Sequence, residues 1–235
     1  MFALARELVA SKGLVITTTT TKIFPPSPED TPCMLVSEDK RAIKDFILNE
    51  GAKHGHITIV SEEIASSGKL KGFDPELIQE VCKVSPETII IVEADGAAGR
   101  PLKAPNIEHE PVIPKNSSLI IPVVGIDALG CELTEEYVFR AAIAARLTGM
   151  ALGDNVTSEV IVSLMTHKYG MFYGCPVHAR VVPFINKTDL DNSISDARAL
   201  ASGILEAGHP QIDCVVLGQA KIQPHVLESL NGRYI

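Results

Sequence analysis

Hydrophobic positions near the start of the chain follow helical spacing and then give way to an apolar run. Phe2, Ala5, Leu8 and Val9 recur at the spacing of one helix face, and Gly13 is placed to end that helix. The segment LVITTTTTKI follows directly and is rich in β-branched residues. It predicts a strand that is apolar at its start and polar at its end.

Strands and helices are expected to alternate along the rest of the chain. The segment TIIIVEADG is the clearest expected strand, since residues 89–92 are apolar on both faces, which is typical of a central parallel strand. The alternation predicts an α/β fold, with a doubly wound, mostly parallel sheet and helices on both faces, in a single domain over residues 1–235. The other expected strands are CMLV, ITIV, SLIIPVVG, RVVPFINK and DCVVLG. The expected helices run from near 37 to near 51, over 76–84, 134–147 and 157–167, and from 193 to 208 with a capping box formed by Ser193 and Asp196.

Composition and net charge mainly argue against certain classes of binding partner. With 46% hydrophobic residues, the 235-residue chain can bury a sizeable core. A formal net charge of -8 disfavours nucleic acids and anionic membranes, but it leaves room for a small anionic ligand in a local basic pocket. No apolar stretch approaches the roughly 18 residues of a membrane span. Five widely spaced cysteines without a C-x-x-C pair, and an amphipathic start instead of a signal peptide, favour reduced thiols and a cytoplasmic location.

Three expected strand ends are unusually polar. They cover residues 17–22, 93–99 and 186–189. In open parallel sheets, ligands bind beyond the carboxyl ends of the strands. We therefore expect these three ends to converge on one crevice.

The segment EADGAAGRPLKAP crowds two acids and two bases at the end of one strand. Carboxylates at Glu93 and Asp95 suit Mg²⁺, and Gly96 allows a backbone to approach a phosphate closely. A solvated polar turn is the alternative, but such crowding costs stability unless a ligand compensates it. We assign Glu93 and Asp95 as candidate catalytic and metal-binding residues, and Gly96, Arg100 and Lys103 as candidate ligand-binding residues.

Asn186, Lys187 and Asp189 stand in the N-K-x-D arrangement that reads guanine. The Asp can accept hydrogen bonds from the base edge, and the Lys stem can cover the ring. The alternative is an ordinary strand exit, since Asn and Asp favour turns. The position at the end of an apolar strand favours the nucleotide-related interpretation.

Other candidates carry weaker signals. Thr20, Thr21 and Lys22 end the threonine run and are candidate contacts to phosphate or metal-bound water, although Thr is also a common strand residue. His54 and His56 lack an evident third metal ligand, so we interpret them as a solvated loop pair. The sequence contains neither a G-x-x-x-x-G-K-[ST] motif nor a Ser or Cys triad signature.

Several blocks, in order, resemble the YqeC-type selenium-dependent hydroxylase accessory proteins. They are TTTTTKIFPP, IIIVEADGAAGRPLKAP, EHEPVIP, VVGIDALG, GMFYGCP and ARVVPFINKTDL. The resemblance implies a P-loop NTPase-like fold, akin to the nucleotide-dependent metallochaperones of urease, hydrogenase and cobalamin enzymes. Glu93 and Gly96 match the E-x-x-G of those relatives, and Asn186, Lys187 and Asp189 match their N-K-x-D. It also implies Mg²⁺ and GTP or ATP as cofactors, and selenium-dependent molybdenum hydroxylases or cofactor-handling proteins as partners.

The chain departs from the family pattern at two places. Family members begin with a strand and a Gly-rich loop ending in Gly-Lys-Thr, whereas Met1 stands where the following helix has begun. We therefore expect an N-terminally truncated P-loop NTPase-like chain whose missing loop is encoded upstream and without which nucleotide binding is weak. Phe139-Arg140 stands where members commonly show His-Arg.

Two functions remain open at this point. The first is a nucleotide-binding accessory protein, with GTP favoured by Asp189, that hydrolyses nucleotide only if the missing loop is present. The alternative is a non-catalytic cofactor-binding or scaffold protein that has lost hydrolysis. The sequence leaves the physiological ligand and the oligomeric state open, a homodimer included.

Overall fold

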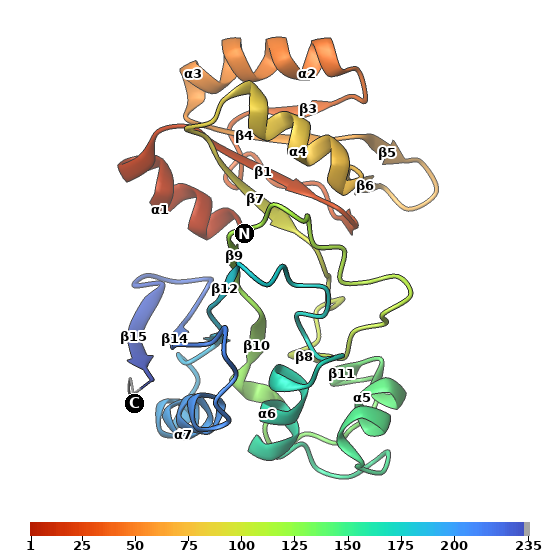
Figure 1. Cartoon of the computed structure of the whole chain (residues 1–235), viewed down its shortest axis with the longest axis vertical. Coiled ribbons are helices and arrows are strands. Elements are labelled where there is room, and N and C mark those ends of the chain that lie inside the picture. Colours follow the sequence, from red (N-terminus) through yellow and green to blue (C-terminus); the bar gives the residue numbers. More distant parts are fainter. Residues whose placement is uncertain (233–235) are drawn as a thin grey trace. The chain divides into compact units, whose positions relative to one another are not determined.

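The computed structural model describes residues 1–232, without the side chains of residues 11 and 12, and it divides into two compact units (Figure 1). Unit 1 consists of Met1–Gly96 and Val112–Lys115, and unit 2 of Ala97–Pro111 and the chain from Asn116 onward. The expectation of one domain over residues 1–235 stays a prediction.

Unit 1 contains a four-stranded parallel sheet and a small antiparallel sheet. Its strands are β1 (Val15–Thr19), β2 (Lys22–Ile23), β3 (Met34–Val36), β4 (His56–Val60), β5 (Glu62–Ile64), β6 (Lys69–Lys71) and β7 (Ile89–Glu93); its helices are α1 (Phe2–Lys12), α2 (Lys40–Phe46), the π-helix η1 (Ile47–Gly51), α3 (Ala52–His54) and α4 (Pro75–Val84). The parallel sheet has the order β3-β4-β1-β7, and the antiparallel sheet the order β2-β6-β5. In the register of β1 and β7, Thr19 lies opposite Glu93.

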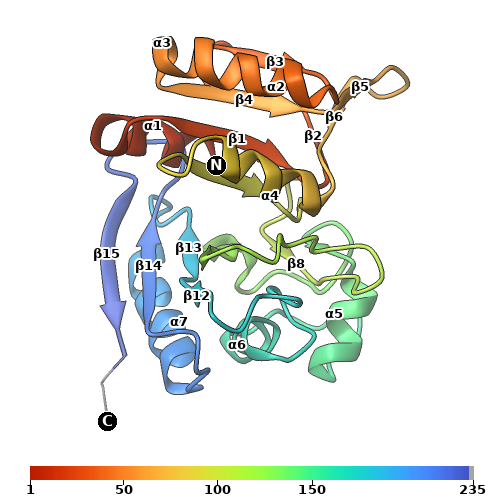
Figure 2. The same cartoon turned by 45° about the horizontal axis from the view of Figure 1, so that its top comes forward.

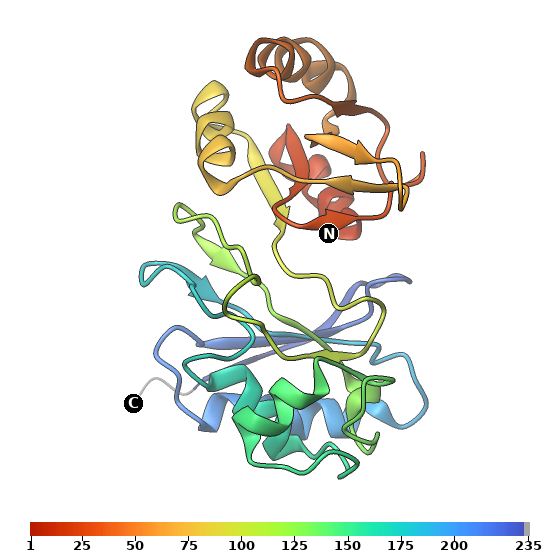
Figure 3. The same ribbon diagram turned by 90° about the vertical axis from the view of Figure 1, so that its right-hand side faces the viewer.

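The two faces of the parallel sheet differ in polarity. On one face, Ile16 and Ile57 belong to a buried cluster with Ile43 of α2 and Ile78 of α4. The opposite face carries buried polar groups, among them His56, whose ring lies 6.3 Å from that of Phe2 in α1. Helices therefore cover both faces, as the upper part of Figure 3 shows.

Unit 2 contains a mixed four-stranded sheet and two small parallel ladders. Its strands are β8 (Leu102–Lys103), β9 (Leu119–Ile120), β10 (Val123–Gly125), β11 (Val138–Phe139), β12 (Arg180–Val181), β13 (Phe184–Asn186), β14 (Cys214–Gly218) and β15 (Val226–Asn231); its helices are the 3₁₀ turn η2 (Ile126–Ala128), α5 (Ala141–Thr148), α6 (Ser158–Thr166) and α7 (Ser193–Glu206). The sheet order is β10-β13-β14-β15, with only β15 antiparallel. β8 pairs with β11, and β9 with β12.

One hydrophobic cluster forms the core of unit 2. It joins Val124, Ile185 and Leu217 of the sheet to Leu164 of α6 and Leu200 of α7, all with at most 1% exposure. Figure 2 shows α7 beside β14. Because these three strands are parallel, their carboxyl ends lie at one edge of the sheet.

The α/β class and the mostly parallel strands are confirmed, whereas the expected single sheet is wrong. The described residues form two four-stranded sheets and three smaller ones. The expected strand TIIIVEADG forms β7 over Ile89–Glu93, but β7 is at the edge of its sheet, where β1 is its one partner among the described strands. The next apolar run supplies β9 and β10, which belong to unit 2.

Proline and side-chain caps explain most local differences. Pro122 and Pro183 divide the strands expected over SLIIPVVG and RVVPFINK, because proline cannot donate to a ladder. The helix expected over 134–147 begins only at Ala141, because Val138 and Phe139 form β11 and the Glu135 carboxylate accepts hydrogen bonds from the N–H groups of Arg140 and Ala141. The Ser193 capping box is wrong, since the Ser193 hydroxyl donates to the carbonyl of Leu190 instead.

The sequence analysis predicted the state of the cysteines correctly but missed one strand. The last strand, β15, was missed by the sequence analysis. All five cysteines are free thiols, in agreement with the sequence. Among the described residues, none of the helices has the length and apolar character needed to traverse a bilayer.

Candidate functional site

In unit 1, the carboxyl ends of β1 and β7 bring hydroxyl groups to Glu93. Thr19 Oγ1 lies 2.7 Å from Glu93 Oε2 and 2.8 Å from the Glu93 carbonyl oxygen. Thr21 Oγ1 also donates to Glu93 Oε2, and the Thr21 N–H donates to Thr19 Oγ1 at 2.9 Å. Two hydroxyls therefore fix the Glu93 carboxylate at the end of the sheet. We call Thr19, Thr21 and Glu93 the hydroxyl–carboxylate cluster.

The other oxygen of Glu93 lies beside Gly96. A Cβ on Gly96 would stand 2.9 Å from Glu93 Oε1, so only glycine leaves this oxygen its present space. Asp95, two residues beyond the end of β7, is half-buried. Carboxylate and hydroxyl oxygens are ligands that Mg²⁺ accepts, so the residue types at this edge fit that ion.

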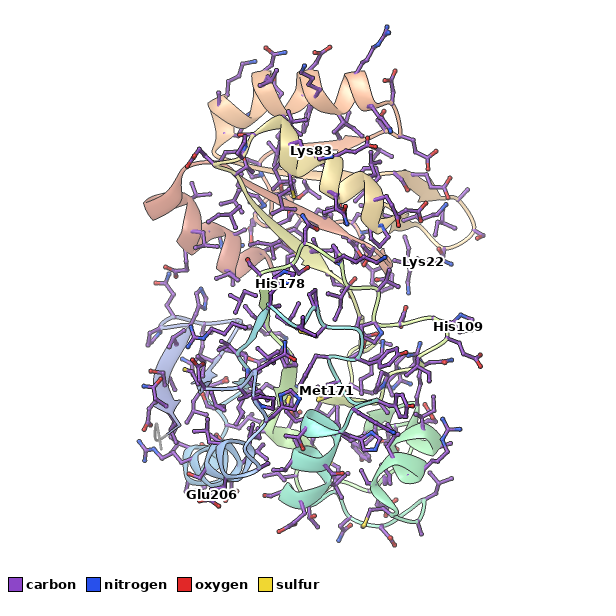
Figure 4. All side chains as sticks on the ribbon, viewed as in Figure 1. Lys22, Lys83, His109, Met171, His178 and Glu206 are labelled. Atoms are coloured by element: carbon purple, nitrogen blue, oxygen red, sulfur yellow. The ribbon has the colours of Figure 1, made fainter. Side chains whose placement is uncertain are left out.

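Two of the predicted contacts lie outside this cluster. The Thr20 hydroxyl donates to the carbonyl of Val112 at 2.7 Å, within unit 1, and not to Glu93. Lys22, labelled in Figure 4, is exposed in β2 opposite Lys71 of β6. The Thr20 N–H donates to the Glu93 carbonyl oxygen at 3.0 Å. Of the three residues predicted to end the threonine run as phosphate contacts, Thr21 is the one whose hydroxyl donates to the Glu93 carboxylate in the described part of the chain.

In unit 2, three cations surround the ring of Phe139. The Arg100 guanidinium carbon, Lys103 Nζ and the Arg140 guanidinium carbon lie 5.4, 5.1 and 5.1 Å from the ring centroid. Glu110 Oε2 accepts from Lys103 Nζ at 2.8 Å and from Arg140 Nη2 at 2.9 Å. We call Arg100, Lys103 and Arg140 the cation cluster.

Arg140 has an unusual backbone and an unsatisfied buried atom. It adopts a left-handed conformation, with φ 64° and ψ 51°, at the start of α5. Its Nη1 atom is buried without a hydrogen-bond partner among the described residues. A buried guanidinium N–H without an acceptor is costly, and an anion bound there would remove that cost.

The N-K-x-D segment is tied to the neighbouring strand exit. Asn186 Oδ1 accepts from the N–H of Ala220 at 2.9 Å, just beyond β14. The Thr188 hydroxyl donates to the carbonyl of Gly218 at 2.9 Å. These two hydrogen bonds hold the exit loops of β13 and β14 together at the carboxyl edge of the sheet.

Lys187 and Asp189 have different surroundings. Lys187 adopts a positive φ of 66°, and its Nζ lies 2.6 Å from Asp127 Oδ2. Asp127 follows β10, and its Oδ1 is buried with no hydrogen-bond partner in the described part of the chain. Asp189 is exposed, so its carboxylate is open to solvent and to a ligand.

The structure therefore groups the predicted residues into separate clusters. Residues 17–22 and 93–96 meet within unit 1, and residues 186–189 are in unit 2, so convergence on one crevice stays a prediction. The sequence analysis missed Glu110, Asp127 and Arg140 as cluster members. Asp127 follows an apolar strand in VVGIDALG, which was a signal that could have found it, whereas the contacts of Arg140 with Glu110 join segments 30 residues apart.

Comparison with known proteins places these clusters in a family. A family model described as "YqeC protein" matches residues 1–142, more than half of the chain. The chain belongs to the YqeC family. It is 33% identical over 207 residues to "Uncharacterized protein YqeC" of Escherichia coli (strain K12), covering 85% of this chain and 76% of that protein. No solved structure matches the chain.

The YqeC match includes two of the three clusters. The hydroxyl–carboxylate cluster and the cation cluster both lie within residues 1–142, and the N-K-x-D segment lies beyond them. The printed name of the E. coli YqeC relative states no activity.

Proposed function

We propose that this chain is a nucleotide-binding accessory protein, with GTP favoured over ATP, that acts in the maturation of selenium-dependent molybdenum hydroxylases or their metallocofactor. The nucleotide part rests on one observation, the N-K-x-D segment whose Asn186 side chain accepts from the N–H of Ala220. The maturation part, and the P-loop NTPase-like fold that belongs to the same proposal, rest on the family resemblance. The mostly parallel α/β architecture is compatible with that fold.

The surroundings of the N-K-x-D segment suit the recognition of a base. Two exit loops held by hydrogen bonds give a preformed edge, which reduces the entropy lost when a ligand binds. Asp189 supplies an exposed carboxylate that can accept from two adjacent N–H groups of guanine. The ion pair with Asp127 orients the Lys187 side chain, whose methylene stem is then available to cover an aromatic ring.

The hydroxyl–carboxylate cluster of unit 1 supplies oxygen ligands of the kind that Mg²⁺ binds. Glu93 and Asp95 would hold Mg²⁺ or its bound waters, with Gly96 and Thr21 beside them. Mg²⁺ bound there would neutralise phosphate charge. Lys22 is exposed on β2 and carries the cation that we assign to the phosphates.

Competition between GTP and ATP for a fluorescent guanine nucleotide tests base recognition. Asp189→Ala is expected to lower the preference for GTP by about 10- to 100-fold, since losing one acceptor costs ~1–3 kcal/mol. Asp191→Ala, an exposed acid two residues further on, is the matched control and should leave the preference unchanged. If Asp189→Ala left the ratio of GTP to ATP affinity unchanged, residues 186–189 would be an ordinary strand exit and not a guanine-binding motif.

A second pair of measurements separates the metal from the base. Glu93→Ala is expected to weaken the dependence of binding on Mg²⁺ with little effect on the ratio of GTP to ATP. A version of the protein preceded by an apolar strand and a Gly-rich loop ending in Gly-Lys-Thr should bind nucleotide about a thousandfold more tightly, because backbone N–H groups of such a loop hold the β-phosphate. Equal affinity of the two versions would contradict the P-loop part of the proposal.

The cation cluster favours a second candidate, a non-catalytic protein that binds an anionic cofactor or serves as a scaffold. Arg140 Nη1 is a buried donor without an acceptor among the described residues, and Arg100 and Lys103 lie around the same ring. Pyrophosphate titration is the test, because it supplies the anion without a base. Arg140→Gln should abolish pyrophosphate binding, and Arg146→Gln, an exposed cation of the same helix, should not.

A further inference from the structure

We propose that Cys33, Glu50 and His54 form a binding site for a divalent transition metal of the zinc class in unit 1. One ligand atom of each side chain lies within 4.8 Å of the other two. In a tetrahedral zinc site, with bonds of about 2.0–2.3 Å, ligand atoms are roughly 3.5 Å apart. Small side-chain rotations would therefore close the three ligands onto one ion.

The three ligands come from two backbone segments with fixed positions. Cys33 precedes β3, and its carbonyl accepts from the N–H of Thr58 in β4 at 2.9 Å. Glu50 lies in the π-helix η1, and His54 follows one turn later at the end of α3. Gly55 then ends the helix in a left-handed conformation, with φ 69°, and leads into β4.

The π-helix is an independent sign of a functional position. Five-residue π segments are rare and occur frequently at functional sites, because they change which side chains share one face of a helix. Here the segment Ile47–Gly51 is continuous with α2 before it and α3 after it. It places the Glu50 carboxylate against the His54 ring, with Oε2 3.3 Å from Nε2.

The two oxygens of Glu50 have separate partners. Oε1 lies 2.6 Å from Lys53 Nζ, while Oε2 faces His54. A metal can thus bind Oε2 and the imidazole while Lys53 continues to orient the carboxylate through Oε1.

The donor set indicates the class of metal. Thiolate, imidazole and carboxylate together suit Zn²⁺, whereas Mg²⁺ and Ca²⁺ prefer oxygen ligands alone. Three protein ligands leave a fourth position for water or another molecule. Cys33 and His54 precede parallel strands of the sheet, at the ends opposite to Glu93, so this site is separate from the proposed Mg²⁺ position.

Cobalt titration of the whole chain, reduced and freed of metal with a chelator, tests the proposal. Co²⁺ is a spectroscopic substitute for Zn²⁺, and a thiolate ligand gives a charge-transfer band in the near ultraviolet. We expect one Co²⁺ per chain, with this band present, and displacement by Zn²⁺. Cys33→Ser should remove the band, and His54→Gln should lower the affinity by about 100-fold or more.

Two control variants show whether loss of metal binding is specific to Cys33 and His54. Cys82→Ser changes another half-buried cysteine of unit 1, and His178→Gln changes an exposed histidine labelled in Figure 4. Both should retain the band and the affinity of the original chain, and circular dichroism of all four variants confirms that they fold. Absence of saturable Co²⁺ binding, or binding that persists in Cys33→Ser and His54→Gln, would overturn the proposal.

Discussion

Two adjacent threonines of β1 should respond to the same substitution with opposite signs. Thr17 and Thr18 are both buried, but they face opposite sides of the sheet. Thr17 Oγ1 lies 2.6 Å from Thr58 Oγ1 and 3.0 Å from His56 Nε2. Thr18 Oγ1 is buried with no hydrogen-bond partner among the residues that the structure describes. Replacement by valine removes a satisfied hydroxyl in one case and an unsatisfied hydroxyl in the other.

The magnitudes follow from these contacts. Thr17→Val leaves two buried polar groups one partner short, which should lower the free energy of unfolding by ~1–3 kcal/mol. Thr18→Val removes a hydroxyl from an apolar environment lined by Ile16, Phe73 and Ile90, among others. It should raise the free energy of unfolding by about 1–2 kcal/mol, because the desolvation penalty of the hydroxyl disappears and a methyl group is buried instead.

Urea unfolding of unit 1 measures both effects. The chain contains no tryptophan, so circular dichroism is the suitable probe. Amide hydrogen exchange at β1 and β4 reports on unit 1 alone and separates its opening from that of unit 2. If both variants lost stability to the same extent, the assignment of Thr17 to the polar face and Thr18 to the apolar face would be wrong.

Three further experiments test other contacts of unit 1. Thr21→Val and Glu93→Gln should show a coupling of about 1 kcal/mol in a double-mutant cycle of urea unfolding, since their side chains share one hydrogen bond; additive effects would contradict it. Burial, and secondarily Arg6, lowers the pKa of His56, so its stability contribution is complete above the unfolded pKa of about 6.5 and is lost as the pH falls below it. His56→Gln should flatten that acid loss in a pH series of urea unfolding, and an unchanged slope would exclude His56 as its source. Gly72→Ala should prevent unit 1 from folding, as judged by circular dichroism, because its Cβ would lie 1.7 Å from the Thr19 carbonyl oxygen, whereas Gly68→Ala meets open space and should fold with a small loss from its positive φ.

The sequence predicted local elements better than their assembly. Period-two and 3.6-residue patterns identified β1, β4, β7 and the helices α4, α6 and α7, because these patterns depend on which side chains are buried. Whether TIIIVE is central or at an edge depends on which strands pair, and an apolar strand can occupy either place. The π-helix could not be predicted from the sequence either, because ILNEG differs little from an ordinary helical segment.

The candidate site residues also divide into those that local sequence predicts and those that depend on contacts between distant segments. Glu93 and Asn186 were recognisable because each ends an apolar strand and belongs to a local sequence motif. Glu110, Asp127 and Arg140 acquire their roles through contacts between distant segments, such as the ion pair between Lys187 and Asp127, 60 residues apart. A single sequence contains no direct record of such contacts.

At two strand ends, a glycine of the sequence lies beside a carboxylate in the structure. A Cβ at Gly96 would lie 2.9 Å from Glu93 Oε1, and one at Gly125 would lie 2.3 Å from Asp127 Oδ1. In both places a strand end carries an acid, and the absence of a side chain on the neighbouring glycine leaves room for one carboxylate oxygen.

The two sites differ in what surrounds that oxygen. Gly125 is also crowded by Pro101, whose Cα and Cβ would lie 3.3 and 3.0 Å from the added atom, so rotation of Asp127 alone could not make space. At Gly96 only the end of the Glu93 side chain approaches closely. The glycine at 125 is thus constrained by packing as well as by the carboxylate, whereas a side chain at position 96 would displace only the end of the Glu93 side chain.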